Sequence, residues 1–414
     1  MIAETPDLFH RYLDRRMRRA RGLGNGSQFV FELGAEVSAD AVLDRLAPLA
    51  SRLPLLQAGL PSWPRRRWEP RSDAIAVHEE PIDGSLEAWF ARWFGEPFRP
   101  LDGPSLEIVL GRHDAGTAVL VRWLHALSDA PGMDLLLRLL DGEDPERFRL
   151  EGEAGALVRR VRGKSTIVRR AFDVHALALR QVLRTVPPAW QARVDRRARQ
   201  TVACSTFTAD ETADVWARGR ELASLDRNSF LVGALARATV RAFDVPGWRR
   251  LRIPVPISLR PPAWRGPVLG NWFSIVLLEL PVRRLRSLEE AVETTRAAWK
   301  TALARGEDRA TLALMGAAAT FPPWLARLLL DGPLLRDGAS VNSSYVELKT
   351  GASGTFLDQP LERGIIASSI LAPPGLAGVF AGCAGRLSVS VPGQGEVTAV
   401  LHDALVALLR GDAT

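Results

Sequence analysis

Apolar positions follow two periodicities along this chain, and the two alternate from beginning to end. Spacings of three and four residues predict helices, whereas short β-branched runs bounded by turn residues predict strands. In the first third of the chain the pattern predicts helices over residues 40–53 and 133–140, and strands over 28–33, 75–78, 106–112 and 118–124.

The rest of the chain shows the same mixture. Beyond residue 200 the pattern predicts helices over 208–223, 229–243, 288–304, 310–319 and 397–409, and strands over 202–208, 251–257, 274–280, 340–348, 364–371, 376–381 and 386–391. Such mixtures are typical of α/β proteins. We therefore expect an α/β fold built from α+β two-layer sandwiches, in two subdomains that span residues 1–175 and 176–414.

Composition agrees with two folded domains. The chain has 414 residues, of which 47% are hydrophobic, enough to bury a large core. Its two cysteines, Cys204 and Cys383, lack C-x-x-C spacing, so neither a disulfide scaffold nor a thiolate metal site is indicated. The sequence shows no signal-peptide pattern and no apolar run long enough to span a bilayer. We expect a cytoplasmic protein, with peripheral contact at the inner membrane as a further option.

The net charge is +7, but the kind of basic residue argues against nucleic-acid binding. Only Lys164, Lys300 and Lys349 are lysines among the 54 basic residues, and such an arginine excess is typical of a GC-rich coding sequence. No zinc-finger spacing, RNA-recognition motif or alternation of basic and aromatic residues accompanies it. We therefore expect no nucleic-acid partner.

Residues 122–130 hold the most informative chemistry. His125 follows the predicted strand, and Asp129 comes four residues later, before a Pro-Gly turn. An imidazole titrates near neutral pH, so at a strand end it can take a proton from an attacking hydroxyl or amine, while the aspartate holds the loop. The same pattern also fits a capped strand end, with His125 in the core and Asp129 as a helix cap.

This segment resembles the H-H-x-x-x-D-G motif of the chloramphenicol acetyltransferase-like superfamily, which includes condensation domains, wax ester synthases and polyketide-associated acyltransferases. Residues 96–110 resemble the run that precedes the motif in condensation-like proteins. Residues 256–261 and 269–274 resemble the P-V-x-x-R and G-N-x-x-S elements, and 341–346 and 384–390 resemble the closing strands. In family order, the resemblance covers most of the chain.

The resemblance implies two like-folded subdomains that enclose a channel. It also implies an acyltransferase that moves an acyl group from a thioester to a hydroxyl or amine, with His125 as general base and no covalent acyl-enzyme. Asp129 would pair with Arg260, as the structural aspartate and arginine of the superfamily do. Acyl-coenzyme A or acyl-phosphopantetheine would be the substrate, and no cofactor or metal is implied.

Further candidate residues come from the same resemblance. The substrate channel would be lined by Ser274, Asn271, Trp272, Ser343 and Ser344. Ser274 is a candidate donor to a developing oxyanion. A turn is the preferred interpretation of Asn271, because Gly-Asn before a strand is a common turn pair.

Two positions depart from the motif: Leu124 replaces its first histidine and Ala130 replaces its final glycine. Glycine permits a conformation or close approach that a Cβ discourages, so Ala130 predicts a slightly remodelled loop or an impaired catalyst. A catalytically degenerate binding or scaffolding module is therefore the alternative to an acyltransferase. We favour catalysis because His125, Asp129 and Arg260 are all present. Phosphate-binding loops and G-x-S-x-G elbows are absent from the sequence.

Positive charge is concentrated in the segment 157–200, which carries twelve basic and two acidic side chains. Apolar residues recur among them at roughly helical intervals, which predicts an amphipathic helix with an arginine-rich face. Three interpretations remain open: a solvated linker between the subdomains, a contact with an anionic membrane surface, and a contact with an acidic acyl carrier protein.

Overall fold

The chain is described by a computed structural model. The described residues are 10, 11, 13–15, 17, 18, 24–59, 68–70, 75–98, 104–148, 199–224, 226–260, 268–320, 339–350, 352–370 and 375–412. Two predictions fall outside them: the subdomain boundary at 175/176, and the basic segment 157–200 except for its last two residues.

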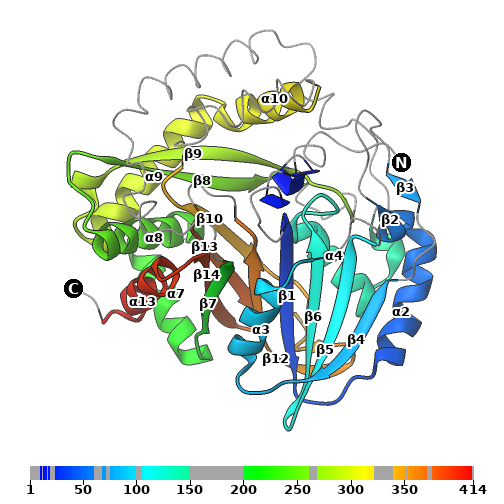
Figure 1. Ribbon diagram of the computed structural model, residues 1–414. Coiled ribbons are helices and arrows are strands. Elements are labelled where there is room, and N and C mark those ends of the chain that lie inside the picture. Colours follow the sequence, from blue (N-terminus) through cyan, green and yellow to red (C-terminus); the bar gives the residue numbers. More distant parts are fainter. Residues whose placement is uncertain are drawn as a thin grey trace.

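A six-stranded sheet carries the segment with His125. Its order is β11 (Thr355–Phe356), β12 (Gln359–Ser368), β1 (Gly26–Leu33), β6 (Gly116–Leu124), β5 (Leu106–His113) and β4 (Ala76–Pro81). Neighbouring strands are antiparallel, except that β4 runs parallel to β5. Helices α2 (Ala39–Arg52) and α4 (Ala130–Leu140) pack on one face of the sheet, and α3 (Leu86–Gly95) packs on the other (Figure 1).

Strand β6 lies at the centre of this sheet, and all nine of its residues are buried. Alternate side chains enter the two cores: Trp123 packs edge-on against Phe29 on the α4 face, while Leu120 joins the α3 face. Strands buried on both faces read as continuous apolar runs, which explains why this strand was predictable from sequence. It ends at Leu124 and delivers the chain directly to His125.

A second sheet has the order β10 (Asn342–Glu347), β13 (Ala377–Cys383), β14 (Arg386–Gln394) and β7 (Gln200–Thr206). Its core includes helices α7 (Ala209–Ala223), α8 (Arg227–Phe243), α9 (Leu288–Ala304) and α13 (Val397–Arg410). The two sheets lie side by side in Figure 1, and β12 of the first sheet packs against β13 and β14 of the second.

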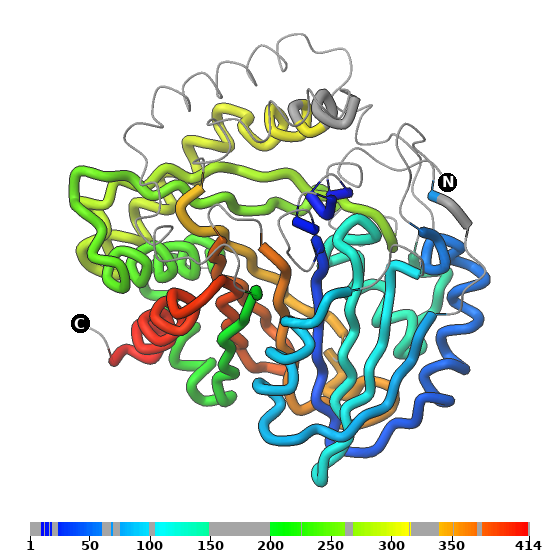
Figure 2. The backbone as a smooth tube through the Cα atoms, in the orientation of Figure 1, coloured from blue at the N-terminus to red at the C-terminus, as the bar shows by residue number. Residues whose placement is uncertain are grey.

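A separate two-stranded ribbon links the second half of the chain to the end of β6. It pairs β8 (Arg250–Ser258) with β9 (Phe273–Pro281), and helix α10 (Glu307–Thr320) packs against β9. Figure 2 shows the ribbon running across the top of both sheets toward α4. At its inner end Gly270 forms a parallel bridge with Ser128, and its N–H donates to the Leu127 carbonyl at 2.8 Å. This ribbon therefore brings residues 268–274 to the end of β6.

The two halves of the chain interlock. Strands β11 and β12 come from the last quarter of the sequence, yet they extend the sheet that also holds β1 and β6. The core on the α4 face accordingly combines Phe29 with Ile366 and Val379. Strands from the first and the last parts of the chain therefore share one sheet.

Most predicted elements are confirmed, with ends shifted by a few residues. Helix α3 was missed: its short aromatic-rich sequence suits a strand as well as a helix, and only its packing against the sheet decides. The strand predicted over 202–208 ends at Thr206, and Thr208 caps α7 in a reciprocal capping box with Glu211. In the part of the chain that the structure describes, no helix has the length and apolar character needed to cross a membrane.

Candidate active site

His125 is half-buried where β6 ends, and three separate parts of the chain hold it. Its backbone N–H donates to the Asn25 carbonyl at 2.8 Å, which continues the β1–β6 pairing by one step. Its Nδ1 lies 3.1 Å from Asn271 Oδ1, and its ring stacks on that of His10. The imidazole is thus fixed by its own strand, the N-terminal segment and the ribbon.

Asn271 sets the tautomer of His125. Its Nδ2 donates to the carbonyls of His125 and Ala126, at 2.8 and 3.3 Å, and this orients the amide so that Oδ1 faces the imidazole. An amide oxygen only accepts hydrogen bonds, so Nδ1 of His125 must carry the ring hydrogen. The lone pair is left on Nε2, the nitrogen that can act as a base. The Gly-Asn pair, interpreted from sequence as a turn, also holds His125.

Burial lowers the pKa of His125 below its ordinary value of 6.5. A hydrogen bond to its own carbonyl, the negative charge of Asp129 and the contact with Asn271 act in the opposite direction and favour the charged ring. The imidazole is therefore neutral at pH 7 and can accept a proton. When it does, Asp129 stabilises the resulting cation.

Asp129 and Arg260 are brought together as the resemblance implied. Arg260 donates from Nη2 and Nε to Asp129 Oδ1, at 2.7 and 3.2 Å, and both side chains are buried. The backbone N–H groups of Gly132 and Trp272 complete the set, donating to Oδ1 and Oδ2 at 2.8 and 2.7 Å. Asp129 is also the N-cap of α4. One carboxylate thus joins the helix, the His125 loop and the ribbon.

The departures from the motif have simple structural consequences. Leu124 is completely buried in the sheet, away from solvent. Ala130 is the first residue of α4 and has a helical backbone, so this position does not need the conformational freedom of glycine. The expected remodelling of the loop is therefore not required. The close approach occurs instead at Gly132, where a Cβ would lie 2.3 Å from Arg260 Nη2.

The remaining predicted channel residues lie in different places. Trp272 is buried, and its main chain bonds to Asp129 and Leu259. Ser274 is also buried, and its hydroxyl donates to the Asp308 carbonyl in α10. Its one hydroxyl hydrogen is therefore used in a structural hydrogen bond. Ser343 and Ser344 lie on β10 of the second sheet, and neither has a described bond to His125.

Sequence analysis missed two residues of the site. His10 and Asn25 lie in the N-terminal part of the chain, outside any pattern that marks them as functional. Asn25 donates from Nδ2 to His10 Nδ1 at 2.8 Å, and its carbonyl receives the His125 N–H. The pairing of β1 with β6 brings Asn25 to His125, and the bonds from Asn25 hold His10 beside it, so no local signal could have found them.

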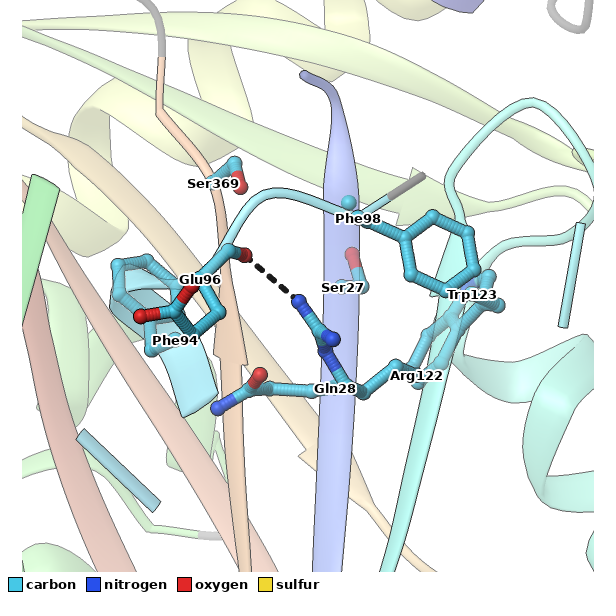
Figure 3. Close-up of a pocket in the computed structure, with 9 residues that line it drawn as sticks. Ser27, Gln28, Phe94, Glu96, Phe98, Arg122, Trp123 and Ser369 are labelled. Atoms are coloured by element: carbon cyan, nitrogen blue, oxygen red, sulfur yellow. Dashed lines mark hydrogen bonds between the residues drawn. The ribbon is translucent and has the colours of Figure 1, made fainter. Parts of the chain in front are cut away.

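A small cavity lies along the same strands on the α3 face (Figure 3). Arg122 crosses it to donate to the Glu96 carbonyl at 2.7 Å and is paired with Glu107. Its volume is about 20 Å³, room for a single water molecule and too small for an acyl chain. Its wall is formed by Gly26, Ser27, Gln28, Phe94, Glu96, Phe98, Arg122, Trp123 and Ser369.

Comparison of the sequence with known proteins identifies few relatives. No protein-family profile matches the chain. Two Mycobacterium tuberculosis proteins, uncharacterized protein Rv2305 of strain H37Rv and uncharacterized protein MT2362 of strain CDC 1551, are each 27% identical over 241 residues. The match covers 54% of this chain and 54% of each relative, so the chain spans about half the length of the curated relatives it matches.

Solved structures reveal the fold. The first condensation domain of the calcium-dependent antibiotic synthetase, solved with a substrate analogue, has a TM-score of 0.71 at 18% identity, covering 99% of this chain and 95% of that chain. The condensation domain of Monacolin K polyketide synthase MokA has a TM-score of 0.64 at 12% identity, covering 99% and 96%. The starter condensation domain of rhizomide synthetase, solved with C8-CoA, has a TM-score of 0.64 at 12% identity, covering 99% and 94%. The chain therefore has the condensation-domain fold, which the sequence resemblance implied.

Proposed function

We propose that this chain, which has the condensation-domain fold, is an acyltransferase that moves an acyl group from a thioester donor to a hydroxyl or amine acceptor. Fold alone does not determine function, so the proposal depends on the site. The observation that carries it is His125: a half-buried neutral imidazole with its hydrogen on Nδ1 and its lone pair on Nε2.

The reaction follows from that geometry as general base catalysis. Nε2 of His125 takes the proton of the acceptor O–H or N–H while the acceptor attacks the thioester carbonyl carbon. The tetrahedral intermediate then expels the thiolate, and the imidazolium returns the proton to the sulfur. The products are an ester or amide and a free thiol, and no covalent acyl-enzyme forms.

Asp129 supports this step in two ways. It stabilises the imidazolium by its charge, which raises the pKa of His125. Its bonds to Arg260 and to the N–H of Trp272 also hold the ribbon, and with it Asn271, against the His125 loop. The strength of these Asp129 bonds matters less to the reaction than their effect of holding the His125 imidazole in one geometry.

The acyl donor and the partner of the basic segment are part of the same proposal. We propose acyl-coenzyme A or an acyl carrier protein as the donor, with the pantetheine thioester as the shared chemistry. In line with the sequence prediction, the basic segment 157–200 would contact an acidic carrier protein or an anionic membrane surface in the cytoplasm. The alternative, a binding or scaffolding module, rests on Leu124 and Ala130 alone.

The test is thiol release from a panel of acyl-coenzyme A and acyl-carrier-protein donors with mixed alcohol and amine acceptors. We expect acceptor-dependent release that His125→Ala lowers by at least about 10²-fold. His78→Ala is the matched control, because this histidine is 54% exposed and lies on β4, away from the site. The rate constant should hold above pH 7 and decline as the pH falls below 6.5, since protonation removes the base.

Two results would overturn the proposal. Release that continues unchanged in His125→Ala would show that this imidazole is not the base. A parent protein that binds donors yet releases no thiol with any acceptor would favour the binding module.

A further inference from the structure

A second imidazole lies directly against the proposed base. The rings of His10 and His125 stack with centroids 3.8 Å apart and planes only 4° from parallel. His10 is 5% exposed, so its ring is enclosed by the protein. Phe273 approaches both rings at an angle, with centroids 5.3 Å from His10 and 6.0 Å from His125. The ring of His10 therefore lies over one face of the His125 ring.

The position of His10 is anchored. Nδ1 of His10 accepts from Asn25 Nδ2 at 2.8 Å, so its ring hydrogen is on Nε2. The same Nδ2 also donates to the His10 carbonyl at 3.3 Å. Asn25 is held in turn, because its N–H donates to Asp14 Oδ1 at 2.9 Å. His10 and His125 are thus both bonded to Asn25, one through its side chain and one through its main chain.

The N-terminal segment is tied down at a second point. Arg18 pairs with Asp14 at 2.9 Å and donates to the Phe98 carbonyl at 3.1 Å. Gly24 has a φ of +88° and passes so close that a Cβ there would lie 2.7 Å from Asp14 Oδ1. These contacts therefore hold the described residues of this segment closely packed beside the site.

We propose that His10 is a positioning residue for His125, whose ring covers one face of the base, excludes water from it and keeps Nε2 in the plane set by Asn271. This inference rests on the proposed role of His125 as base. It assigns a task to a histidine that lies outside the H-x-x-x-D motif. The rate of the reaction falls steeply when the base is misplaced. A His10 ring that holds the His125 ring in one plane therefore contributes to the rate of acyl transfer.

The charges around the two rings are consistent with both imidazoles, His10 and His125, being neutral. Burial lowers the pKa of His10 well below 6.5, and the positive charge that His125 can carry lowers it further. Two carboxylates near the rings are paired with arginines: Asp129 with Arg260, and Asp14 with Arg18. Burial also lowers the pKa of His125, and the stacked ring of His10 is one of the groups that enclose it.

The experiment is a titration of the histidine ring nitrogens by nuclear magnetic resonance, on the full chain, in the parent protein and three variants. His10→Ala removes the ring. His10→Phe keeps a flat ring but has no titrating nitrogen, and His78→Ala is the control outside the site. Thermal unfolding establishes that each variant is folded.

We expect His10→Ala to raise the pKa of His125 toward 6.5 by about half a unit or more, because water then reaches the ring. His10→Phe should leave it low, since the covered face stays dry. In turnover, His10→Ala should lower kcat by about tenfold with KM changed less than about twofold, whereas His10→Phe should keep most of kcat. His78→Ala should resemble the parent in both readouts.

An unchanged His125 titration in His10→Ala would overturn the inference. If that variant does not fold, His10→Gln gives the same comparison, because it offers Asn25 an acceptor but has no ring. The titration needs no turnover, so the two proposals fail separately. A shifted His125 in a protein without acyl transfer would retain the positioning role and reject the proposed reaction.

Discussion

At the scale of single residues, Gly132 shows how tightly the His125 loop is built. A Cβ at this position would lie 2.3 Å from Arg260 Nη2 and from Ser128 Oγ, and 2.6 Å from the Val268 carbonyl. A backbone carbonyl, and a guanidinium held in hydrogen bonds, cannot move aside cheaply. Gly132 is therefore required where the helix and the ribbon meet, whereas Ala130 at the helix start is not restricted.

We predict that Gly132→Ala destabilises the protein by about 1–3 kcal/mol, because it overpacks the contact with Arg260. Urea unfolding measures this. Ala130→Gly is the matched variant two residues away, and it should cost no more than about 1 kcal/mol, the helix-propensity difference. Equal losses in the two variants would contradict the prediction.

At the scale of elements, Asp134 ties helix α4 to the chain that follows β10. Its Oδ1 accepts from the N–H groups of Lys349 and Thr350, at 2.9 and 2.8 Å, and from Thr350 Oγ1 at 2.8 Å. Burial raises the pKa of this carboxyl to about 6, against the opposing effect of those bonds. A helix and a segment far from it in the sequence thus meet at one buried oxygen.

We predict that Asp134→Ala costs about 2–3 kcal/mol, because it leaves buried donors unsatisfied. The folded-state pKa lies above the ordinary 3.8, so the folded chain binds this proton more tightly than the unfolded chain. The resulting stabilisation is fully present below pH 3.8 and is lost as the pH rises through about 6. Asp134→Asn keeps the Oδ1 acceptor and cannot ionise, so it should remove this contribution to the pH dependence. Urea unfolding between pH 4 and 8 compares the three proteins, and identical pH profiles for the parent and Asp134→Asn would refute the assignment.

At the scale of the whole molecule, the Asp129–Arg260 pair connects the sheet that carries His125 with the ribbon that carries Asn271. Both side chains are almost inaccessible, at 6% and 3% exposure. Breaking a buried pair leaves an uncompensated charge, whereas removing both partners does not. The pair should therefore act as one unit in both stability and catalysis.

We predict that Asp129→Ala and Arg260→Ala each destabilise the protein by about 3–5 kcal/mol, and that the double variant loses less than their sum. Both single variants should also lose acyl transfer, because Asn271 is no longer held against His125. Arg52→Ala is the control, since Arg52 pairs with Glu146 at the surface and should cost no more than about 1 kcal/mol. Additive losses in the double variant would show that the two groups are not coupled.

What the sequence determined by itself was local. Helices, strands and caps depend on near neighbours along the chain, so β6, α4 and the Asp129 cap could be predicted from periodicity and residue type. The H-x-x-x-D spacing, together with the family resemblance, singled out His125 as a candidate, because a strand end and the following helix start are both short-range features.

Only the tertiary structure decided the rest. The placement of His10 and Asn25, the amide of Asn271 that orients the imidazole, and the strand β12 within the first sheet all depend on which distant segments pair and in which register. Close approaches such as that at Gly132 arise in the same way. The hydrophobic pattern and the turns constrain the register of each strand pair. The packing of the whole core decides which distant strands pair and in what order they lie in each sheet.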